Sequence, residues 1–282
     1  MVRIVSDSTC DLSEELIDRY GIYILPLYVR LGDKEYLDGI DIKPEDLYKW
    51  SDEHSDTPKT AAPSLSDFVQ IFDKDSDDEY VLFTISSDMS ACNNNARLAA
   101  EQLALGDRLV IIDSQNLSTG IGHLVIEAAE MAERDFSAKE IGEKIEEFIP
   151  KVRASFVVDT LTYLYRGGRC SGLTALIGTA MKLHPKIVVE DGKMKPANKY
   201  RGGLKKYIMD YVKDLEEPLL NAKKDRVFIT HSGCDKEIVD MVKQYIADLH
   251  HFNEILVTRA GGVISSHCGP GTLGVLFISE ED

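Results

Sequence analysis

The sequence predicts an α/β protein with two domains, each built from a β-sheet and flanking helices. Three observations support this fold class. Short apolar runs typical of buried strands alternate with helical patterns in the first half, which indicates a largely parallel sheet. The second half contains a strand–turn–strand pattern among its helices, which favours a mixed sheet. The residue pattern changes near residue 150, so we expect an N-terminal domain over 1–150 and a C-terminal domain over 151–282.

The first half alternates strand-like runs with helices. The run 2–5 ends at turn-forming and helix-capping residues, and the helix that follows ends at Gly21. The other expected strands are 22–32, 80–86 and 108–114. Helical spacing is found around Tyr48 and Trp50, over 93–105, over 120–135 and from Ser137 onward.

The second half begins with an expected strand over 154–159. An apolar segment rich in small residues, 172–183, has helical spacing, and two strands flank the turn at Asp191 and Gly192. The remaining expected elements are helices over 204–216 and 235–248 and strands over 226–232, 254–261 and 272–279.

Charge and cysteine content exclude several classes of protein. With 48 acidic and 32 basic residues the formal net charge is −16, which argues against broad binding to nucleic acids. The five cysteines are scattered and form no C-x-x-C pair, so we expect reduced thiols in a cytoplasmic protein. The chain starts directly on a strand-like run, and no apolar run approaches the roughly 18 residues that span a bilayer. We therefore expect no signal peptide and no stable membrane insertion, which leaves room for transient contact with a membrane surface.

Two motif matches fail on their context. Gly269, Gly271 and Gly274 fit the dinucleotide pattern G-x-G-x-x-G, but an expected strand follows them where the fingerprint requires a helix. The acidic stretch 73–79 lacks the glycine and the glutamate of a calcium loop. The histidines also show no H-E-x-x-H spacing. The sequence therefore predicts neither a metal site nor a cofactor.

Three hydroxyl-rich stretches follow strands of the first half, namely "SDSTCD", "ISSDMSA" and "DSQNLSTG". The carboxyl ends of parallel strands meet at one edge, so these stretches should gather where α/β proteins bind ligands. Free N–H groups at helix starts suit a phosphate or a carboxylate. The alternative is that the hydroxyls of these stretches do no more than cap helices. A hydrolase also remains open, with Ser90 or Ser87 as nucleophile, His267 as base, and Asp7 or Asp113 as the orienting acid.

Taken together, several motifs resemble those of the DegV family, in the same order and over nearly the whole chain. They are "VSDSTCDL", "ILPLYV", "YLDGIDI", "KTAAPS", "ISSDMSA", "IIDSQNLSTGIGHLV", "LYRGGR" and "SHCGPGTLGV". The family is similar to the fatty-acid-binding subunits of bacterial fatty acid kinase. The resemblance implies a non-catalytic protein that holds a long-chain fatty acid between its domains while a separate kinase phosphorylates the carboxylate.

The resemblance also assigns residues to the carboxylate site. Thr60 matches the threonine of the Thr-x-x-Pro-Ser motif, Ser90 the serine of the usual Leu-Ser-Gly-Thr motif, and His267 the histidine before Gly-Pro-Gly. Ala91 and Cys92 depart from that motif, where Gly and Thr are usual, and the Cβ of Ala91 makes close backbone approach less easy. We expect Thr60, Ser90, Ala91 and His267 to contact the carboxylate. We expect the fatty acid as ligand and no cofactor.

Two further features complete the expected function. The segment 172–183 is suited to line a tunnel for the acyl chain, or forms an ordinary core helix. Arg169 and Arg201 each lie beside a Gly-Gly pair, and the resemblance implies contact with the kinase or the acyl-phosphate, the alternative being charges that confer solubility. Two other functions remain: an acyl hydrolase that uses Ser90 and His267, and a binder of another acidic small molecule.

Overall fold

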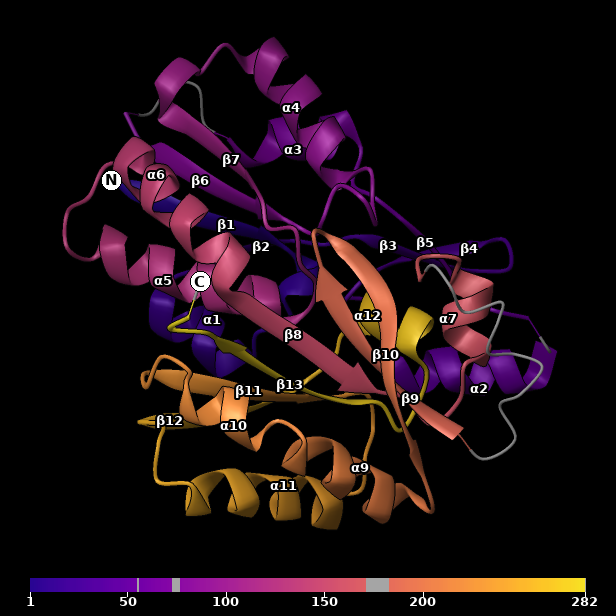
Figure 1. The fold of residues 1–282 in the computed structure, drawn as a ribbon. Helices are drawn as coiled ribbons and strands as arrows, with labels where there is room; N and C mark the ends of the chain where they lie inside the picture. Colours follow the sequence, from indigo (N-terminus) through magenta and orange to yellow (C-terminus); the bar gives the residue numbers. More distant parts are fainter. Residues whose placement is uncertain (55, 73–76, 171–182, 282) are drawn as a thin grey trace.

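The computed structural model describes residues 1–54, 56–72, 77–170 and 183–281 (Figure 1). Its N-terminal half contains a four-stranded sheet in the order β2–β1–β6–β7, and every neighbouring pair is parallel. This confirms the prediction of a parallel sheet. The strands are β1 (Val2–Asp7), β2 (Tyr23–Leu25), β6 (Glu79–Thr84) and β7 (Leu109–Asp113).

Helices cover both faces of this sheet. Alternate strand residues point to opposite faces, so Val5 and Leu82 pack toward α3 and α4, whereas Ile4 and Phe83 pack toward α5 and α6. Helix α1 follows β1 and ends at Gly21, as predicted, with a φ of 60°. The helices are α1 (Glu14–Tyr20), α3 (Leu65–Ile71), α4 (Cys92–Leu103), α5 (Thr119–Ala132) and α6 (Ala138–Phe148).

The C-terminal half forms a six-stranded mixed sheet in the order β10–β9–β8–β13–β11–β12, which confirms the second part of the fold prediction. Among its described strands, β11 and β12 pair in parallel and the other neighbours pair antiparallel. Asp191 and Gly192 form the predicted turn between β9 and β10, both with positive φ. The strands are β8 (Val152–Val157), β9 (Leu183–Glu190), β10 (Lys193–Arg201), β11 (Arg226–His231), β12 (Glu254–Arg259) and β13 (Leu273–Ile278).

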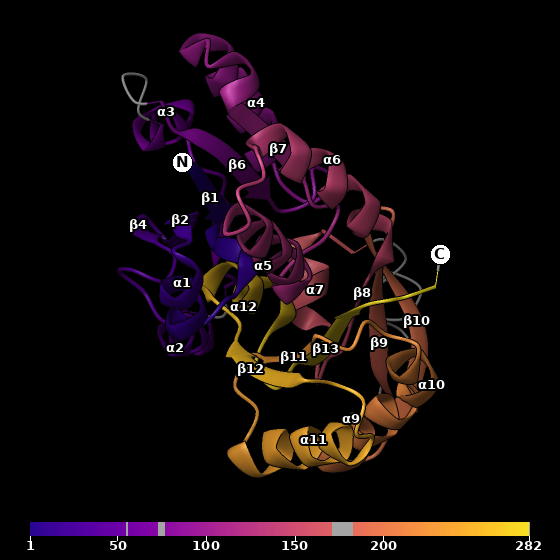
Figure 2. The ribbon, with the colours of Figure 1, turned by 90° about the vertical axis from the view of Figure 1, so that its left-hand side faces the viewer.

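Helix α5 lies between the two sheets. It packs on β1 and β6 of the parallel sheet and on β8 and β13 of the mixed sheet (Figure 2). The imidazole Nε2 of buried His123 is hydrogen-bonded to the backbone oxygen of Leu276 at 3.0 Å. One hydrophobic cluster therefore continues through both halves, and the division at residue 150 stays a prediction. Helices α9 (Leu204–Lys213), α10 (Glu216–Leu220) and α11 (Lys236–Asp248) cover the opposite face of the mixed sheet.

The expected single strand over 22–32 was wrong, because the run divides between two sheets. Pro26, which has no backbone N–H to donate, separates β2 from β3. Strand β3 joins a small antiparallel sheet in the order β4–β3–β5. Its strands are β3 (Tyr28–Leu31), β4 (Lys34–Leu37) and β5 (Lys59–Ala61), and the helices beside it are α2 (Pro44–His54), α7 (Thr162–Gly167) and α12 (Gly262–Cys268).

Helix α12 is an element that the sequence analysis missed. The expected turn is present, since Gly269 and Gly271 have φ values of 76° and 73°, but His267 belongs to the last turn of the helix that precedes it. Glycine, valine and serine give this segment low helix propensity, so it relies on packing against α2 and α7. The predicted tail-binding segment 172–183 lies outside the described residues except for Leu183, which begins β9.

Candidate functional site

A cavity of about 230 Å³ lies between β5, the loops that follow β6 and β7, and helix α12. Both halves of the chain contribute to its wall, as expected for a ligand bound between them. Thr60, Ser90, Ala91, Arg169 and His267 line it, so the structure brings together five of the six residues predicted for the site. The rest of the lining is mainly apolar: Leu27, Ala61, Ala62, Ile85, Met89, Leu117, Met194, Val263, Ile264 and Cys268.

The central polar contact joins Thr60 to His267. Strand β5 places Thr60 opposite Val29 of β3, and α12 brings His267 to it, so that Oγ1 and Nε2 lie 2.9 Å apart. Burial, and after it the positive charge of Arg169, lowers the pKa of His267 to about 4. The imidazole is therefore neutral at pH 7 and carries one ring proton.

The other ring nitrogen of His267 is enclosed by α7. Nδ1 is buried and has no hydrogen-bond partner among the described residues. A Cβ at Gly167 would lie only 2.4 Å from Nδ1, so this glycine makes room for the ring. When Nε2 carries the ring proton, the ring N–H donates a hydrogen bond to Thr60 Oγ1. The threonine hydroxyl is then free to donate its own hydrogen bond to a ligand oxygen.

Ser90 and its neighbours form the second polar part of the wall. The Ser90 hydroxyl donates to Cys92 Sγ at 3.2 Å and accepts from the Cys92 N–H at 3.3 Å. Burial raises the pKa of the Cys92 thiol above its usual range, so the sulfur stays protonated. Ala91 has a φ of −78°, which any residue adopts, and its backbone does not require the glycine that is usual in the family.

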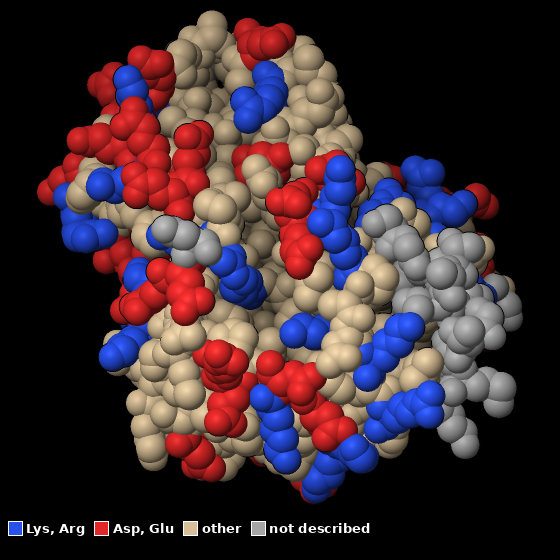
Figure 3. Space-filling view, in the orientation of Figure 1, with Lys and Arg blue, Asp and Glu red and all other residues tan. Residues whose placement is uncertain are grey.

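The two predicted arginines lie in different places. The Arg169 guanidinium lines the cavity, where Nη1 donates to the Gly167 backbone oxygen at 2.7 Å. Arg201 is exposed at the far end of β10, seven residues from Met194 in the cavity wall, or roughly 20 Å along a strand. In Figure 3 basic side chains gather toward the right, on the side of β9, β10 and α7, whereas acidic ones dominate the upper left.

Two of the three hydroxyl-rich stretches reach the cavity. Ile85 and Ser90 come from the stretch after β6, and Leu117 from the stretch after β7. The stretch after β1 does not line it, because its side chains are bonded inside the protein: Ser8 Oγ, for example, donates to Asp38 Oδ2 at 2.8 Å. Sequence reasoning also missed the apolar wall from Met194 and α12, which only tertiary packing assembles.

The contacts do not form the chain of groups that a Ser–His hydrolase requires. His267 is bonded to Thr60, and no hydrogen bond between His267 and Ser90 is found in the described part of the chain. Asp7 accepts from Thr9 and from the Ile85 N–H, and Asp113 accepts from the Ser87 N–H, so neither acid orients the imidazole. Nor do the described residues include three or more His, Cys, Asp or Glu grouped to hold a metal, or a helix both long and apolar enough to cross a membrane.

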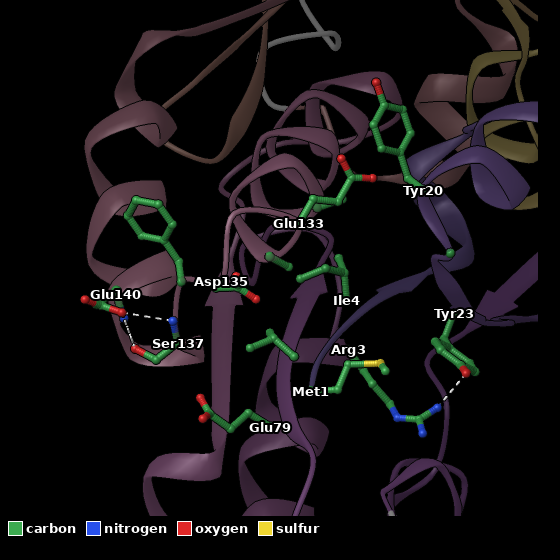
Figure 4. Close-up of a pocket in the computed structure, with 15 residues that line it drawn as sticks. Met1, Arg3, Ile4, Tyr20, Tyr23, Glu79, Glu133, Asp135, Ser137 and Glu140 are labelled. Carbon is green, nitrogen blue, oxygen red and sulfur yellow. Dashed lines mark hydrogen bonds between the residues drawn. The ribbon is translucent and has the colours of Figure 1, made fainter.

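A larger and more open cavity, of about 670 Å³, lies at the start of β1 and β6, away from this site (Figure 4). None of the predicted site residues lines it. Several of its polar groups are already paired within the chain: Arg3 Nη1 donates to the Tyr23 hydroxyl at 2.6 Å, and Glu140 accepts from Ser137. The smaller cavity is therefore the stronger candidate, although it encloses less space.

Comparisons with known proteins identify the family of the chain. A family model described as "Uncharacterised protein, DegV family COG1307" matches residues 1–280. A DegV domain-containing protein of Caldanaerobacter subterraneus subsp. tengcongensis is 33% identical over 98% of both chains. A fatty-acid-binding DegV family protein of Thermus thermophilus is 32% identical with a TM-score of 0.90 over 99% of both chains. A stearic-acid-binding protein of Eubacterium ventriosum is 26% identical with a TM-score of 0.85 over 99% of both. The chain belongs to the DegV family.

Proposed function

We propose that this protein binds a long-chain fatty acid and presents its carboxylate to a separate kinase subunit, without catalysing a reaction itself. The observation that carries the proposal is the bonded pair Thr60–His267 at the wall of a mainly apolar cavity. Such a cavity fits an amphiphile with one polar end. The fatty acids bound by the Thermus and Eubacterium relatives support the same ligand class.

The polar groups suit a carboxylate head. Its two oxygens accept about four hydrogen bonds. Thr60 and Ser90 each offer a hydroxyl proton, and the Ala91 backbone lies in the same part of the wall. Ser90 must turn away from Cys92 to donate, which costs little because sulfur is a weak acceptor.

The polar groups around the carboxylate are mostly neutral, so the carboxylate stays reactive. His267 is neutral at pH 7, and Arg169 is the cation in the described wall. One carboxylate oxygen can then attack the γ-phosphorus of ATP held by the kinase, forming the acyl-phosphate while ADP leaves. In this proposal Arg169 stabilises the negative charge on the transferred phosphoryl group, and exposed Arg201 belongs to the kinase-docking surface.

The acyl chain supplies most of the affinity. Burying each methylene contributes about 0.8 kcal/mol, and the wall beyond Thr60 is built from aliphatic and methionine side chains. We propose that the segment 172–183 completes the tail-binding surface.

Mass spectrometry of an organic extract tests the ligand class. Protein purified from cells should release fatty acid, and delipidated protein should take up added palmitic or oleic acid. Protein that is both empty and unable to take up either acid would refute the proposal. Purified loaded protein mixed with Mg²⁺ and ATP should release no ADP, because the kinase is a separate chain. ADP formation that survives further purification would contradict the carrier role.

A further inference from the structure

Two of the family-like motifs contain aspartates that lie outside the cavity wall. Asp11 belongs to "VSDSTCDL" and Asp38 to "YLDGIDI", and their side chains are only 5% and 3% exposed. Buried carboxyl groups are costly unless their oxygens are hydrogen-bonded. The partners of these two groups therefore indicate what they do.

Both aspartates bond to the first residues of helix α12. The Gly261 N–H donates to Asp11 Oδ1 at 2.8 Å, and the Gly262 N–H donates to Asp38 Oδ1 at 2.6 Å. Asp38 also accepts from the Val263 N–H. These contacts connect residues more than 220 positions apart, and Figure 2 shows the yellow α12 beside the indigo N-terminal segment.

The second oxygen of each aspartate is anchored in the N-terminal half. Asp38 Oδ2 accepts from Ser8 Oγ at 2.8 Å, and Ser8 Oγ in turn accepts from the N–H of Leu27, a cavity residue. Asp11 Oδ2 accepts from Ser118 Oγ at 2.5 Å, next to Leu117 in the cavity wall. Each carboxyl group is thus a bridge between α12 and a loop that lines the cavity.

The backbone around these bridges is adapted to them. A Cβ at Gly262 would lie 2.8 Å from Asp38 Oδ1, so only glycine permits the contact without displacement. Asp11 and Ser118, which bond to each other, have φ values of 51° and 54°. Positive φ is strained for residues other than glycine, and such strain persists only where the surrounding structure imposes it.

Helix α12 carries His267, a residue of the proposed carboxylate site. Val263, Ile264, His267 and Cys268 all line the cavity, and His267 at the end of the helix bonds to Thr60. We propose that Asp11 and Asp38 are positioning residues that hold the start of α12 and thereby set the place of His267 at the fatty-acid carboxylate site. This inference rests on the proposed function and extends it to two residues that do not touch the ligand.

Substitution at Asp38 separates its role as a hydrogen-bond acceptor from its charge. Burial raises the pKa of Asp38, and it raises the pKa of Asp11 to about 8, so the protonated form of Asp11 is well populated at pH 7. A protonated carboxyl group still accepts an N–H bond on its carbonyl oxygen. Asparagine keeps an oxygen for the α12 N–H groups and loses only the acceptor of the Ser8 hydroxyl, so it should replace Asp38 better than alanine.

The test compares Asp38→Ala, Asp38→Asn and Gly262→Ala with wild type in the intact chain. The readouts are the Kd for a fluorescent fatty acid, the midpoint of thermal unfolding, and the ¹⁵N NMR signals of the His267 ring. Asp38→Ala and Gly262→Ala should each raise the Kd about tenfold, or about 1.4 kcal/mol, and shift the ring signals. Asp38→Asn should stay within about threefold of wild type. If Asp38→Ala does not fold, Gly262→Ala carries the same test.

Glu127→Gln is the matched control. Glu127 is 5% exposed and also joins the two halves, and its ion pairs are with Lys223 and Arg226, outside α12. It should lower the unfolding midpoint and leave the Kd and the His267 signals unchanged. Wild type that binds fatty acid, with folded Asp38 and Gly262 variants that bind equally well and keep the His267 signals, would overturn the positioning role alone. Wild type that binds no fatty acid would overturn the proposed function.

Discussion

Replacing Thr60 with valine removes one hydroxyl and keeps the shape of the side chain. The hydroxyl bonds to His267 Nε2 at 2.9 Å, and in the proposed complex it also donates to the fatty-acid carboxylate. A hydrogen bond to a charged group contributes about 1.5–3 kcal/mol, so the Kd for a fatty acid should rise roughly 10- to 150-fold. Without ligand, Nε2 loses its partner as well, which should lower the free energy of unfolding by about 1–3 kcal/mol.

Titration with a fluorescent fatty acid gives the Kd, and urea denaturation of the lipid-free protein gives the stability. Thr258→Val is the matched control, because the Thr258 hydroxyl is buried and bonded to Thr230 away from the cavity. It should lower stability and leave the Kd unchanged. A Thr60→Val protein that binds fatty acid as tightly as wild type would refute the assignment of this hydroxyl to the carboxylate.

Three further predictions concern the same cavity. Gly167→Ala should force the His267 ring away from Thr60 and weaken binding about tenfold in the same titration, because its Cβ would meet Nδ1 at 2.4 Å; unchanged affinity would contradict the close packing. The folded-state pKa of His267, about 4, lies below the ordinary 6.5, so the unfolded chain binds this proton first and stability should fall as the pH drops from about 6.5 toward 4. Urea denaturation should show less of this loss in His267→Gln, and equal slopes would count against a neutral ring. A fluorophosphonate probe should not label Ser90, as judged by intact-protein mass spectrometry. Stoichiometric labelling would instead support Ser90 as the nucleophile of a hydrolase.

Several strands and helices of each half could be predicted because their patterns are local. A short apolar run indicated β1, capping residues indicated α1, and an Asp-Gly pair indicated the β9–β10 turn, all without knowledge of their partners. Helix α12 was missed because local preference does not favour it. Its start depends on Asp11 and Asp38, which are distant in the sequence and reach it only in the folded chain.

The site shows the same limit. The motifs indicated Thr60, Ser90 and His267, and the structure places all three in one cavity wall. No motif indicated that His267 bonds to Thr60 itself, or that Gly167 leaves room for the ring, because both depend on the crossing of β5, α7 and α12. Arg201 resembled Arg169 in its sequence context, yet β10 carries it away from the cavity.

The most direct test of the central claim is the ¹³C NMR spectrum of the protein mixed with a fatty acid labelled at its carboxyl carbon. The Thr60–His267 site predicts a bound carboxyl signal distinct from that of the free acid, and Thr60→Val should shift it. The bound signal should remain in place in Thr258→Val, which keeps the cavity wall intact. A spectrum with only the free-acid signal, or a bound signal that Thr60→Val leaves unmoved, would contradict a carboxylate held at Thr60 and His267.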